Sequence, residues 1–366
     1  MCKIVHLTSV HHLFDTRIFH KECKTLAKLG YEVVLVVQHE QDEKIDGIQI
    51  QALPKPKNRI ERMTRTIWQV YRRAIQENAQ VYHFHDPELI PIGLTLKLQG
   101  QTVIYDVHED VPRQILSKYY IPKYIRHFTS ALIEKIENCA SSYFDEIVTA
   151  TPFIEKRFAK LGRYVINVKN YPIVEELCLL DINLFPKEHA VCYVGGITDI
   201  RGIFEMIEAI GQTDAKLLLA GKFSSGSQRS QAMAMSGWTN VQELGHLNRQ
   251  EVSQTLARAV AGLVVLHPVD NYINALPVKM FEYMSAGIPV IASNFSLWKE
   301  IVEGNQCGIC VDPLNPQAIA KAIQWILEHP DEAKRMGENG RKAVEEKYNW
   351  EAEAEKLRSL YRELFS

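Results

Sequence analysis

Two glycines, an arginine and a further glycine lie close together in the stretch YVGGITDIRG, residues 193–202. Gly195 and Gly196 follow a short apolar run, and Arg201 directly precedes a helical pattern. Because glycine lacks a Cβ, the backbone amides can approach a phosphate closely, and the N-terminus of a helix adds a favourable partial charge. The spacing is neither that of a Walker A loop nor that of a dinucleotide-binding G-x-G-x-x-G. The stretch therefore indicates a phosphate site, with a plain tight turn as the alternative.

Two cations accompany these glycines. Arg201 precedes the helix, and Lys222 follows the apolar run LLLAG. Both would project from loops at strand ends toward the same place, where a pair of cations suits a diphosphate. The alternative for each is an ordinary solvated surface charge.

A third feature is the stretch NALPVKMFEYMSAGIPVIAS, residues 274–293. Pro277 is pre-organised for the first turn of a helix, so we expect unpaired amides from Leu276 to Val278 that are available to an anion. Glu282 follows about one and a half turns later, where its carboxylate could accept hydrogen bonds from ribose hydroxyls. The alternative is an ion pair with Lys279, three residues earlier on the same helix.

The first half of the chain places histidines beside acidic residues in HFHDPE (83–88) and YDVHEDVP (105–112). A metal site is one interpretation, and local capping of the loops is another. Since nothing in the sequence fixes a third ligand, we favour His85 and His108 as polar groups that face a bound substrate. No metal is expected.

The loop TSVHHLFDTRIFHKE (8–22) follows the first apolar run and is rich in charge. Its charged side chains could contact a substrate, or they could form one charged face of a helix; they are Asp15, Arg17, Lys21 and Glu22.

Two segments combine basic and aromatic residues. The stretch 55–73 has seven Lys/Arg and one glutamate, with Trp68 and Tyr71 among its apolar positions, and 118–128 (KYYIPKYIRHF) repeats the combination. Basic amphipathic helices with aromatic residues are attracted to anionic bilayers. We therefore expect peripheral contact with a membrane surface; a solvated helix face or core aromatics are the alternatives.

Short β-rich runs alternate with amphipathic helical stretches throughout the chain, as in KIVHLT, YEVVLVV, VYHFHD and TVIYDVH. This rhythm predicts parallel sheets with helices on both faces. Asn170, Tyr171 and Pro172 interrupt it, and a second series begins at AVCYVGG. We predict an α/β protein with two Rossmann-like, doubly wound domains. The expected boundaries are 1–172 for the first domain, 173–189 for a linker, 190–348 for the second domain, and 349–366 for a final helix that returns to the first.

Length and composition agree with this division. A chain of 366 residues suits two domains, and its net charge of −2 has no polyelectrolyte signature for nucleic acid. The start is not typical of a secretion signal, no apolar run is long enough to span a membrane, and the seven cysteines favour a reduced, cytoplasmic compartment. Cys307 and Cys310 form a C-x-x-C without a second pair, so we expect two small apolar residues that flank a strand.

Taken together, the motifs resemble the retaining nucleotide-sugar glycosyltransferases of family 4, which have the GT-B fold. The stretches YVGGITDIRG, LLLAGKF, VQELGHLNRQEV and NALPVKMFEYMSAGIPVIAS follow one another in the order and spacing of that family. HFHDPE and YDVHEDVP match its two histidine-bearing strand ends in the first domain. The resemblance implies two domains that face each other across a cleft.

The resemblance also implies roles for individual residues. In the second domain Arg201 and Lys222 would neutralise the diphosphate of the donor, and Glu282 would bind the ribose. In the first domain His108 would lie near the transferred sugar. The other implied donor contacts are Gly195, Gly196, Asn274, Ala275, Leu276, Pro277 and Val278. The implied acceptor side consists of Asp15, Arg17, His85, Asp86 and Glu109.

The chain departs from the family pattern at three places. Gly196 stands where the family has an arginine, and SVHHLFDTR replaces a glycine-rich loop after the first strand. Asn274 occupies the position of the first glutamate of a paired-glutamate motif, whose second member is Glu282. An amide offers a donor as well as an acceptor, so we expect Asn274 to tune the donor sugar toward an acetamido or acidic one.

These features predict transfer of a hexose or N-acetylhexosamine from a nucleotide sugar, with UDP as the expected nucleotide, to a glycan or lipid-linked acceptor. The expected setting is the synthesis of cell-surface polysaccharide or lipopolysaccharide, in the cytoplasm or on the inner face of the membrane, without a metal ion. One alternative is a non-catalytic subunit that binds nucleotide sugar or glycan. Another is a nucleotide-sugar epimerase.

Overall fold

The computed structural model describes residues 2–117, 121–162, 164–174 and 186–365. The chain divides into two compact units: unit 1 is Met1–Asn170 with Glu351–Ser366, and unit 2 is Tyr171–Trp350. Each unit is a sheet of mainly parallel strands with helices on both faces, so the predicted fold class is confirmed. The expected linker, 173–189, lies mostly outside the described residues.

Unit 1 contains an eight-stranded sheet of order β3-β4-β2-β1-β5-β6-β7-β8, in which only β3 and β4 pair antiparallel. The strands are β1 (Lys3–His12), β2 (Glu32–Gln38), β3 (Glu43–Ile45), β4 (Ile48–Leu53), β5 (Val81–Phe84), β6 (Thr102–Val107), β7 (Glu146–Thr149) and β8 (Val165–Asn167). The helical segments are η1 (Thr16–Cys23), α1 (Lys24–Lys28), α2 (Arg59–Glu61), η2 (Arg62–Thr66), α3 (Ile67–Gln76), η3 (Pro87–Leu89), α4 (Ile90–Leu98), α5 (Val111–Ser117), α6 (Lys123–Ser141), α7 (Pro152–Ala159) and α17 (Trp350–Leu364).

Unit 2 contains a six-stranded parallel sheet of order β11-β10-β9-β12-β13-β14. The strands are β9 (Ala190–Val194), β10 (Lys216–Ala220), β11 (Val241–Gly245), β12 (Ala261–Val264), β13 (Val290–Ser293) and β14 (Gly308–Val311). The helical segments are η5 (Asp199–Arg201), α9 (Ile203–Ile210), α10 (Gly226–Met233), η6 (Ser236–Asn240), α11 (Arg249–Arg258), α12 (Asp270–Ile273), α13 (Val278–Ser285), α14 (Ser296–Val302), α15 (Pro316–Glu328) and α16 (Pro330–Glu346).

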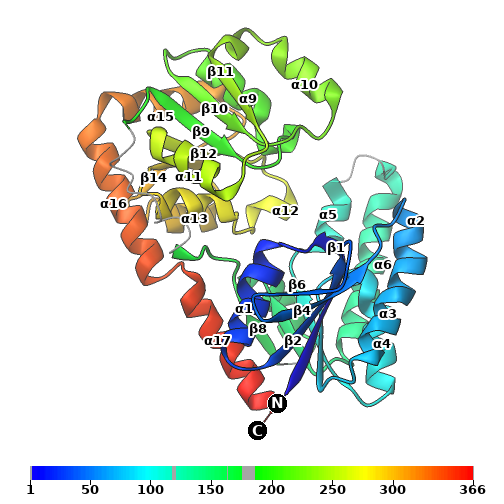
Figure 1. The fold of residues 1–366 in the computed structure, drawn as a ribbon. Coiled ribbons are helices and arrows are strands. Elements are labelled where there is room, and N and C mark those ends of the chain that lie inside the picture. The colour runs from blue at the N-terminus through cyan, green and yellow to red at the C-terminus, as the bar shows by residue number, and fades with distance from the viewer. Residues whose placement is uncertain (1, 118–120, 163, 175–185, 366) are drawn as a thin grey trace. The chain divides into compact units, whose positions relative to one another are not determined.

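The two faces of the unit 2 sheet are covered by different helices. One apolar cluster joins the sheet to α11, α13, α14 and α16, and the other joins it to α9 and α15. A parallel sheet needs both faces covered, which explains why its strands read as continuous apolar runs in the sequence. Figure 1 shows the six strands of unit 2 between these helices.

The unit 1 sheet is apolar on one face and polar on part of the other. Successive side chains of a strand point to opposite faces, so Tyr82 and Phe84 pack with α3 and α4 while His83 points the other way. The same alternation places His6 of β1 on the polar face, directly beside His83 in the pairing register. The sheet therefore carries a row of histidines on one face.

A hairpin in unit 1 was not predicted. Strands β3 and β4 are joined by Asp46 and Gly47, both with positive φ. Asp-Gly is a strong signal for a two-residue hairpin turn whose central residues need positive φ. The sequence therefore contained a signal for this element.

The two cysteines of the C-x-x-C lie at the start of β14 and within it. Cys307 is buried, Cys310 is partly buried, and both are free thiols. Burial raises the pKa of each thiol to about 12. Both therefore behave as small apolar groups at neutral pH.

Among the described residues, no helix is long and apolar enough to cross a membrane.

The final helix, α17, is part of unit 1. Ala354, Leu357 and Leu360 of this helix are buried, and the hydroxyl of Tyr361 lies 2.8 Å from Nδ1 of His83. Because both side chains are enclosed, this hydrogen bond ties α17 to the middle of the sheet.

Replacing Tyr361 with phenylalanine removes only the hydroxyl and leaves Nδ1 of His83 buried without a partner. An unsatisfied buried polar group costs about 1–3 kcal/mol, so urea unfolding of Tyr361→Phe is expected at lower urea than for the wild type. Tyr164→Phe, at an exposed tyrosine of the same unit, is the matched control and should change little. Equal effects of both substitutions would contradict a structural role for the bond.

Candidate active site

In unit 2 the loop after β9 brings two glycines against cationic side chains. Gly195 has a φ of +137°, and a Cβ at this position would lie 3.0 Å from Nζ of Lys279. A Cβ on Gly196 would lie 2.8 Å from Nη1 of Arg201. The positive φ of Gly195 favours glycine, and the lack of a Cβ at both positions leaves room for the ends of the two cationic side chains.

Arg201 is held in place at the end of η5. Its Nη1 donates to the carbonyl of Gly196 at 3.2 Å, and its Nε lies 3.4 Å from the hydroxyl of Tyr272. Burial lowers the pKa of Arg201, but Tyr193 and Tyr272 more than offset this effect. The guanidinium is therefore charged and positioned. Lys222, by contrast, is exposed, although the loop that contains it accepts a backbone hydrogen bond from Ile197.

The segment that precedes α13 is fixed by a buried tryptophan. Nε1 of Trp298 donates to the carbonyl of Ala275 at 2.8 Å, and the Ala275 amide donates to the carbonyl of Tyr272. The helix begins at Val278, with Pro277 as its N-cap residue. Its first amides have no partner within the helix. Asn274 and Leu276 lie in the same segment and are partly exposed.

Glu282 lies on α13 and is almost buried. Its Oε1 accepts a hydrogen bond from Nη1 of Arg249, the first residue of α11, at 2.7 Å. The carboxylate is therefore held as an acceptor by a residue that the sequence analysis did not single out. Arg249 is in VQELGHLNRQEV, but its link to Glu282 is a tertiary contact that spacing does not reveal.

In unit 1 the carboxylate of Asp106 is the centre of a buried polar network. Arg17 donates to both of its oxygens, through Nε at 3.0 Å and Nη2 at 2.8 Å. Burial would raise the pKa of Asp106, but the charge of Arg17 and hydrogen bonds from His108 and His85 outweigh burial and lower it well below its usual range. The sequence analysis missed Asp106, although it lies in YDVHEDVP between strand and loop.

Asp106 also fixes the orientation of the predicted site histidine His108. Nε2 of His108 lies 2.7 Å from Oδ2 of Asp106, so this nitrogen is the donor and Nδ1 is the free acceptor. His85 contacts the same oxygen through Nδ1, at 3.1 Å. Burial, opposed by Asp106, lowers the pKa of His85 to about 4. His85 is therefore neutral and interior, whereas His108 is partly exposed.

A further histidine lies beside His108. The ring of His11 is 5.3 Å from that of His108, and its nitrogens face Asp15 at 3.1 Å and Asp86 at 3.4 Å. Burial would lower the pKa of His11, but the hydrogen bond to Asp15 and the charge of Asp86 raise it. The predicted loop 8–22 is wrong in part, because β1 extends to His12 and η1 begins at Thr16; His11, near the end of β1, is an imidazole that was not predicted.

The remaining predicted residues of unit 1 differ in their surroundings. Arg17 is buried, and it also donates to the carbonyl of Val168. Asp86 is buried and accepts from Thr8 and from the amide of Ser9. Asp15 caps η1, where its carboxylate accepts from two amides. Only Glu109 is fully exposed. Most of these side chains form hydrogen bonds or ion pairs within unit 1.

Two groups of buried side chains have a spacing that could hold a metal ion. One is Glu22 with His85, Asp106 and His108; the other is Glu22 with His6 and His83. Nε of Arg17 lies 3.0 Å from Glu22 and 3.0 Å from Asp106. A guanidinium already lies between the carboxylates, and burial and the charge of Asp106 raise the pKa of Glu22 well above its usual range, so Glu22 is a poor anionic ligand and a dication there would be repelled by Arg17. The residues therefore fit an internal ion-pair network better than a metal site.

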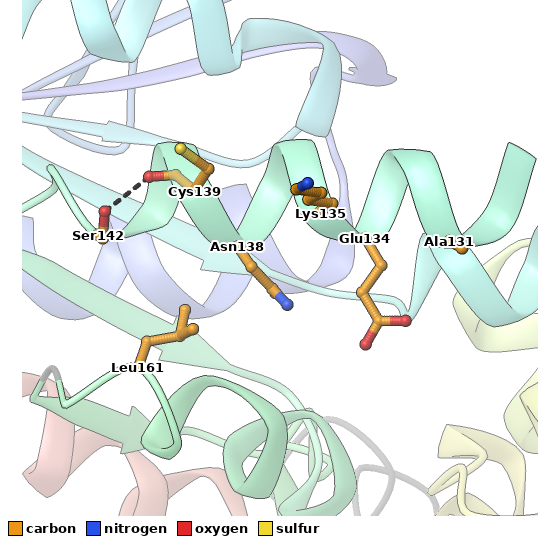
Figure 2. A pocket seen from close by; sticks show the side chains of 7 residues that line it. All are labelled: Ala131, Glu134, Lys135, Asn138, Cys139, Ser142 and Leu161. Carbon is orange, nitrogen blue, oxygen red and sulfur yellow. Dashed lines mark hydrogen bonds between the residues drawn. The ribbon is translucent and has the colours of Figure 1, made fainter.

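Two open hollows lie on the surface of unit 1, and they contain none of the predicted site residues. The larger, about 520 Å³, lies between α6 and Leu161. Figure 2 shows Glu134 and Asn138 pointing from α6 toward it, and Ser142 bonded to the carbonyl of Cys139. The predicted site residues thus lie near the ends of strands and do not line these two hollows.

The buried histidines predict an acid-sensitive unit 1. Burial, followed by repulsion from His85 when both imidazoles are protonated, lowers the pKa of His6 well below its usual range. The unfolded chain therefore binds a proton below about pH 6.5 that the folded protein does not, and stability is lost as pH falls, by about 1.4 kcal/mol per pH unit for one proton. His6→Gln should reduce the slope of unfolding free energy against pH between about 4.5 and 6.5 by that amount. His127→Gln, at an exposed histidine, is the control; an unchanged slope in His6→Gln would mean that His6 is charged when folded.

Comparisons with known families agree with this arrangement. A family model described as Glycosyltransferase Family 4 matches residues 16–167, and one described as Glycosyl transferases group 1 matches residues 181–343. The two matches together cover most of both units.

Curated relatives are distant. The chain is 24% identical over 262 residues to the D-rhamnosyltransferase WbpZ of Pseudomonas aeruginosa, covering 70% of this chain and 66% of that protein. It is 24% identical over 180 residues to the alpha-D-kanosaminyltransferase of Streptomyces kanamyceticus, covering 48% of this chain and 45% of that protein. The aligned regions thus span less than two thirds of each relative.

Solved structures resemble the whole chain. Sucrose-phosphate synthase from Thermosynechococcus elongatus has a TM-score of 0.79 at 19% identity, covering 100% of this chain and 99% of that one. Anabaena Alr3699/HepE in complex with UDP-glucose has a TM-score of 0.74 at 13% identity, covering 99% and 100%. At these identities the likeness concerns the fold. With the two family matches, it shows that the chain belongs to the family 4-like glycosyltransferases of the GT-B fold.

Proposed function

We propose that this protein transfers a hexose or N-acetylhexosamine from a nucleotide sugar, with UDP as the expected nucleotide, to a glycan or lipid-linked acceptor, with retention of anomeric configuration. The expected setting is the synthesis of cell-surface polysaccharide or lipopolysaccharide. One observation carries the proposal. In unit 2, Gly195 and Gly196 follow the end of β9, and the guanidinium of Arg201 lies beside them. Two relatives are named as a rhamnosyltransferase and a kanosaminyltransferase. Their names support an activated sugar as the donor here, but they do not identify which sugar it is.

The chemistry of this site follows from charge. When the glycosidic bond to the donor phosphate breaks, the departing nucleoside diphosphate gains negative charge. Fixed cations and helix amides that face this charge stabilise the transition state without needing to reorganise. Arg201 and the first amides of α13 would supply these groups, and Glu282, oriented by Arg249, would accept hydrogen bonds from the ribose. On this proposal no metal ion is required.

Unit 1 would contribute polar groups toward the sugar and the acceptor. His108 offers a free Nδ1, because its Nε2 is held by Asp106. In this proposal Asp106 is a positioning residue that acts through His108.

Asn274 of unit 2 would favour a donor sugar whose carbonyl or carboxylate accepts a hydrogen bond from its side-chain amide. Uniformly higher activity of Asn274→Glu with every donor sugar would contradict this preference.

Ligand-induced stabilisation tests the donor assignment. A ligand that binds only the folded state raises the melting temperature, so a screen of nucleotide sugars should reveal the base and sugar together. Arg201→Met should weaken nucleotide-sugar binding by about 10–100-fold, since a hydrogen bond to a charged group is worth about 1.5–3 kcal/mol. Lys216→Met, an exposed lysine at the start of β10, is the control. Absence of stabilisation by any nucleotide sugar would refute the proposed function.

Binding without turnover would instead identify a non-catalytic subunit. Release of an epimerised nucleotide sugar without an acceptor would identify an epimerase. Transfer to an acceptor by the wild type, lost in Arg201→Met, distinguishes the transferase from both.

We also propose that unit 1 contacts an anionic membrane surface. Helix α6 exposes an apolar stripe at one-turn spacing, consisting of Tyr124, Ile125, Phe128, Leu132 and Ile136. In the segment 59–68, Ile60, Met63 and Trp68 are exposed among arginines. Each basic residue near an anionic bilayer contributes about 1 kcal/mol. Residues 118–120 of the predicted second segment lie outside the described residues.

Co-sedimentation with vesicles tests this contact. The wild type should bind vesicles that contain phosphatidylglycerol more strongly than vesicles of phosphatidylcholine alone, and added salt should weaken binding. Phe128→Ser, which removes an exposed ring, should reduce binding several-fold. Lys342→Ser on α16 of unit 2, which changes an exposed charge, is the control. Equal binding to both kinds of vesicle would contradict the proposal.

A further inference from the structure

The ammonium group of Lys279 is enclosed in unit 2 without a hydrogen-bond partner. Its Nζ is among the buried side-chain atoms that lack one. Its nearest described partner is the ring of Tyr193, whose centroid lies 3.7 Å away. A cation–π contact of this kind is worth about 2 kcal/mol when it is desolvated, which is less than the cost of burying an unpaired ammonium. A buried amine without a hydrogen-bond partner in a folded protein therefore calls for an explanation.

The ion pair that the sequence allowed is not formed. Lys279 and Glu282 lie three residues apart on α13, but Oε1 of Glu282 accepts from Arg249 at 2.7 Å. Among the described residues, no carboxylate pairs with Lys279. The helix thus separates the two charges, with the glutamate neutralised from α11 and the lysine left free.

Lys279 and Arg201 approach the same strand end. A Cβ on Gly195 would lie 3.0 Å from Nζ and 3.3 Å from Cε of Lys279, while a Cβ on Gly196 would lie 2.8 Å from Nη1 of Arg201. Two cations from different elements, α13 and η5, therefore flank two successive glycines. The positive charge of Arg201 also disfavours the protonated form of Lys279 and so lowers its pKa. Such a convergence of like charges is favourable only when an anion is shared between them.

We propose that Lys279 is the second cation of an anion site at Gly195 and Gly196, where it and Arg201 together bind the diphosphate of the donor nucleotide. This inference rests on the proposed function. It adds Lys279 to the expected diphosphate contacts, while the assignment of the exposed Lys222 stays a prediction.

The charge of Lys279 would change when the anion binds. Burial, followed by the charge of Arg201, holds the pKa of Lys279 well below its usual range, and only Glu282 and Cys192 act in the opposite direction. The groups that face it are Tyr193 and Cys192 from β9, Arg201 from η5 and Glu282 from its own helix. A diphosphate adds negative charge close to Nζ and raises the pKa of Lys279. Binding at a pH above the unliganded pKa would therefore take up a proton.

Calorimetric titration with UDP, GDP and the corresponding nucleosides tests the assignment. Lys279→Met should weaken binding of the preferred diphosphate by about 10–100-fold, as expected for loss of one charge-assisted contact, and leave nucleoside affinity unchanged. Lys299→Met, an exposed lysine on α14, is the matched control. Unchanged diphosphate affinity in Lys279→Met would overturn the inference while leaving the proposed function intact. Failure of the wild type to bind any nucleotide or nucleotide sugar would overturn both.

Two further measurements separate ligand binding from a structural role. Repeating the titration in buffers of different ionisation enthalpy should show uptake of up to about one proton in the wild type and none in Lys279→Met. The melting temperature of unliganded Lys279→Met should equal or exceed that of the wild type, because a buried polar group without a hydrogen-bond partner has been replaced by an apolar side chain. A large fall in the melting temperature would instead show a structural role. Lys279→Gln, which keeps a polar end, serves as the second variant for the affinity measurement.

Discussion

The cost of removing charge from water governs both units of this protein. A buried ion is tolerated when a partner of opposite charge and well-aligned hydrogen bonds replace the lost hydration. In unit 1 this condition is met for Asp106, which Arg17, His85 and His108 contact, and only in part for Glu22, which has Arg17 at 3.0 Å but no hydrogen bond to its oxygens. In unit 2 it is met for Glu282 by Arg249 and is not met for Lys279. Lys279 differs from Glu22 because no carboxylate among the described residues forms an ion pair with it, whereas Glu22 has the guanidinium of Arg17 beside it.

The unit 1 network also explains how a loop histidine acquires a defined orientation. Strand alternation puts His6 and His83 on one face of the sheet, and Asp106 lies on the same face one strand away. The charge of Asp106 is retained because Arg17 is buried with it. His108, at the partly exposed end of the network, therefore has its Nε2 fixed toward Asp106. Only a side chain supported in this way keeps one tautomer, as a positioned polar group requires.

Much of the fold and part of the site could be predicted from the sequence. Apolar runs and glycines at strand ends predicted the two parallel sheets and the loops at Gly195 and Gly196, because these features depend on local spacing. The hairpin at Asp46 and Gly47 was missed although its turn signal is local. Arg249, Asp106 and His11 were missed for another reason: their partners lie on other elements, and a single sequence does not show which tertiary partner a charge takes.

Lys279 illustrates this limit most clearly. On the helix it stands three residues before Glu282, and local rules favour an ion pair worth a few tenths of a kcal/mol. Arg249 is itself exposed, but it forms a hydrogen-bonded ion pair of 2.7 Å with the largely buried Glu282, which is a stronger interaction than an ordinary pair on one helix face. Once Glu282 is taken, the lysine has no acidic neighbour among the described residues, and the glycines at the strand end leave its Nζ next to bare backbone. A tertiary contact thus takes away the carboxylate that local spacing would pair with Lys279, and on the proposed assignment the lysine beside Arg201 becomes the second cation when an anionic diphosphate binds.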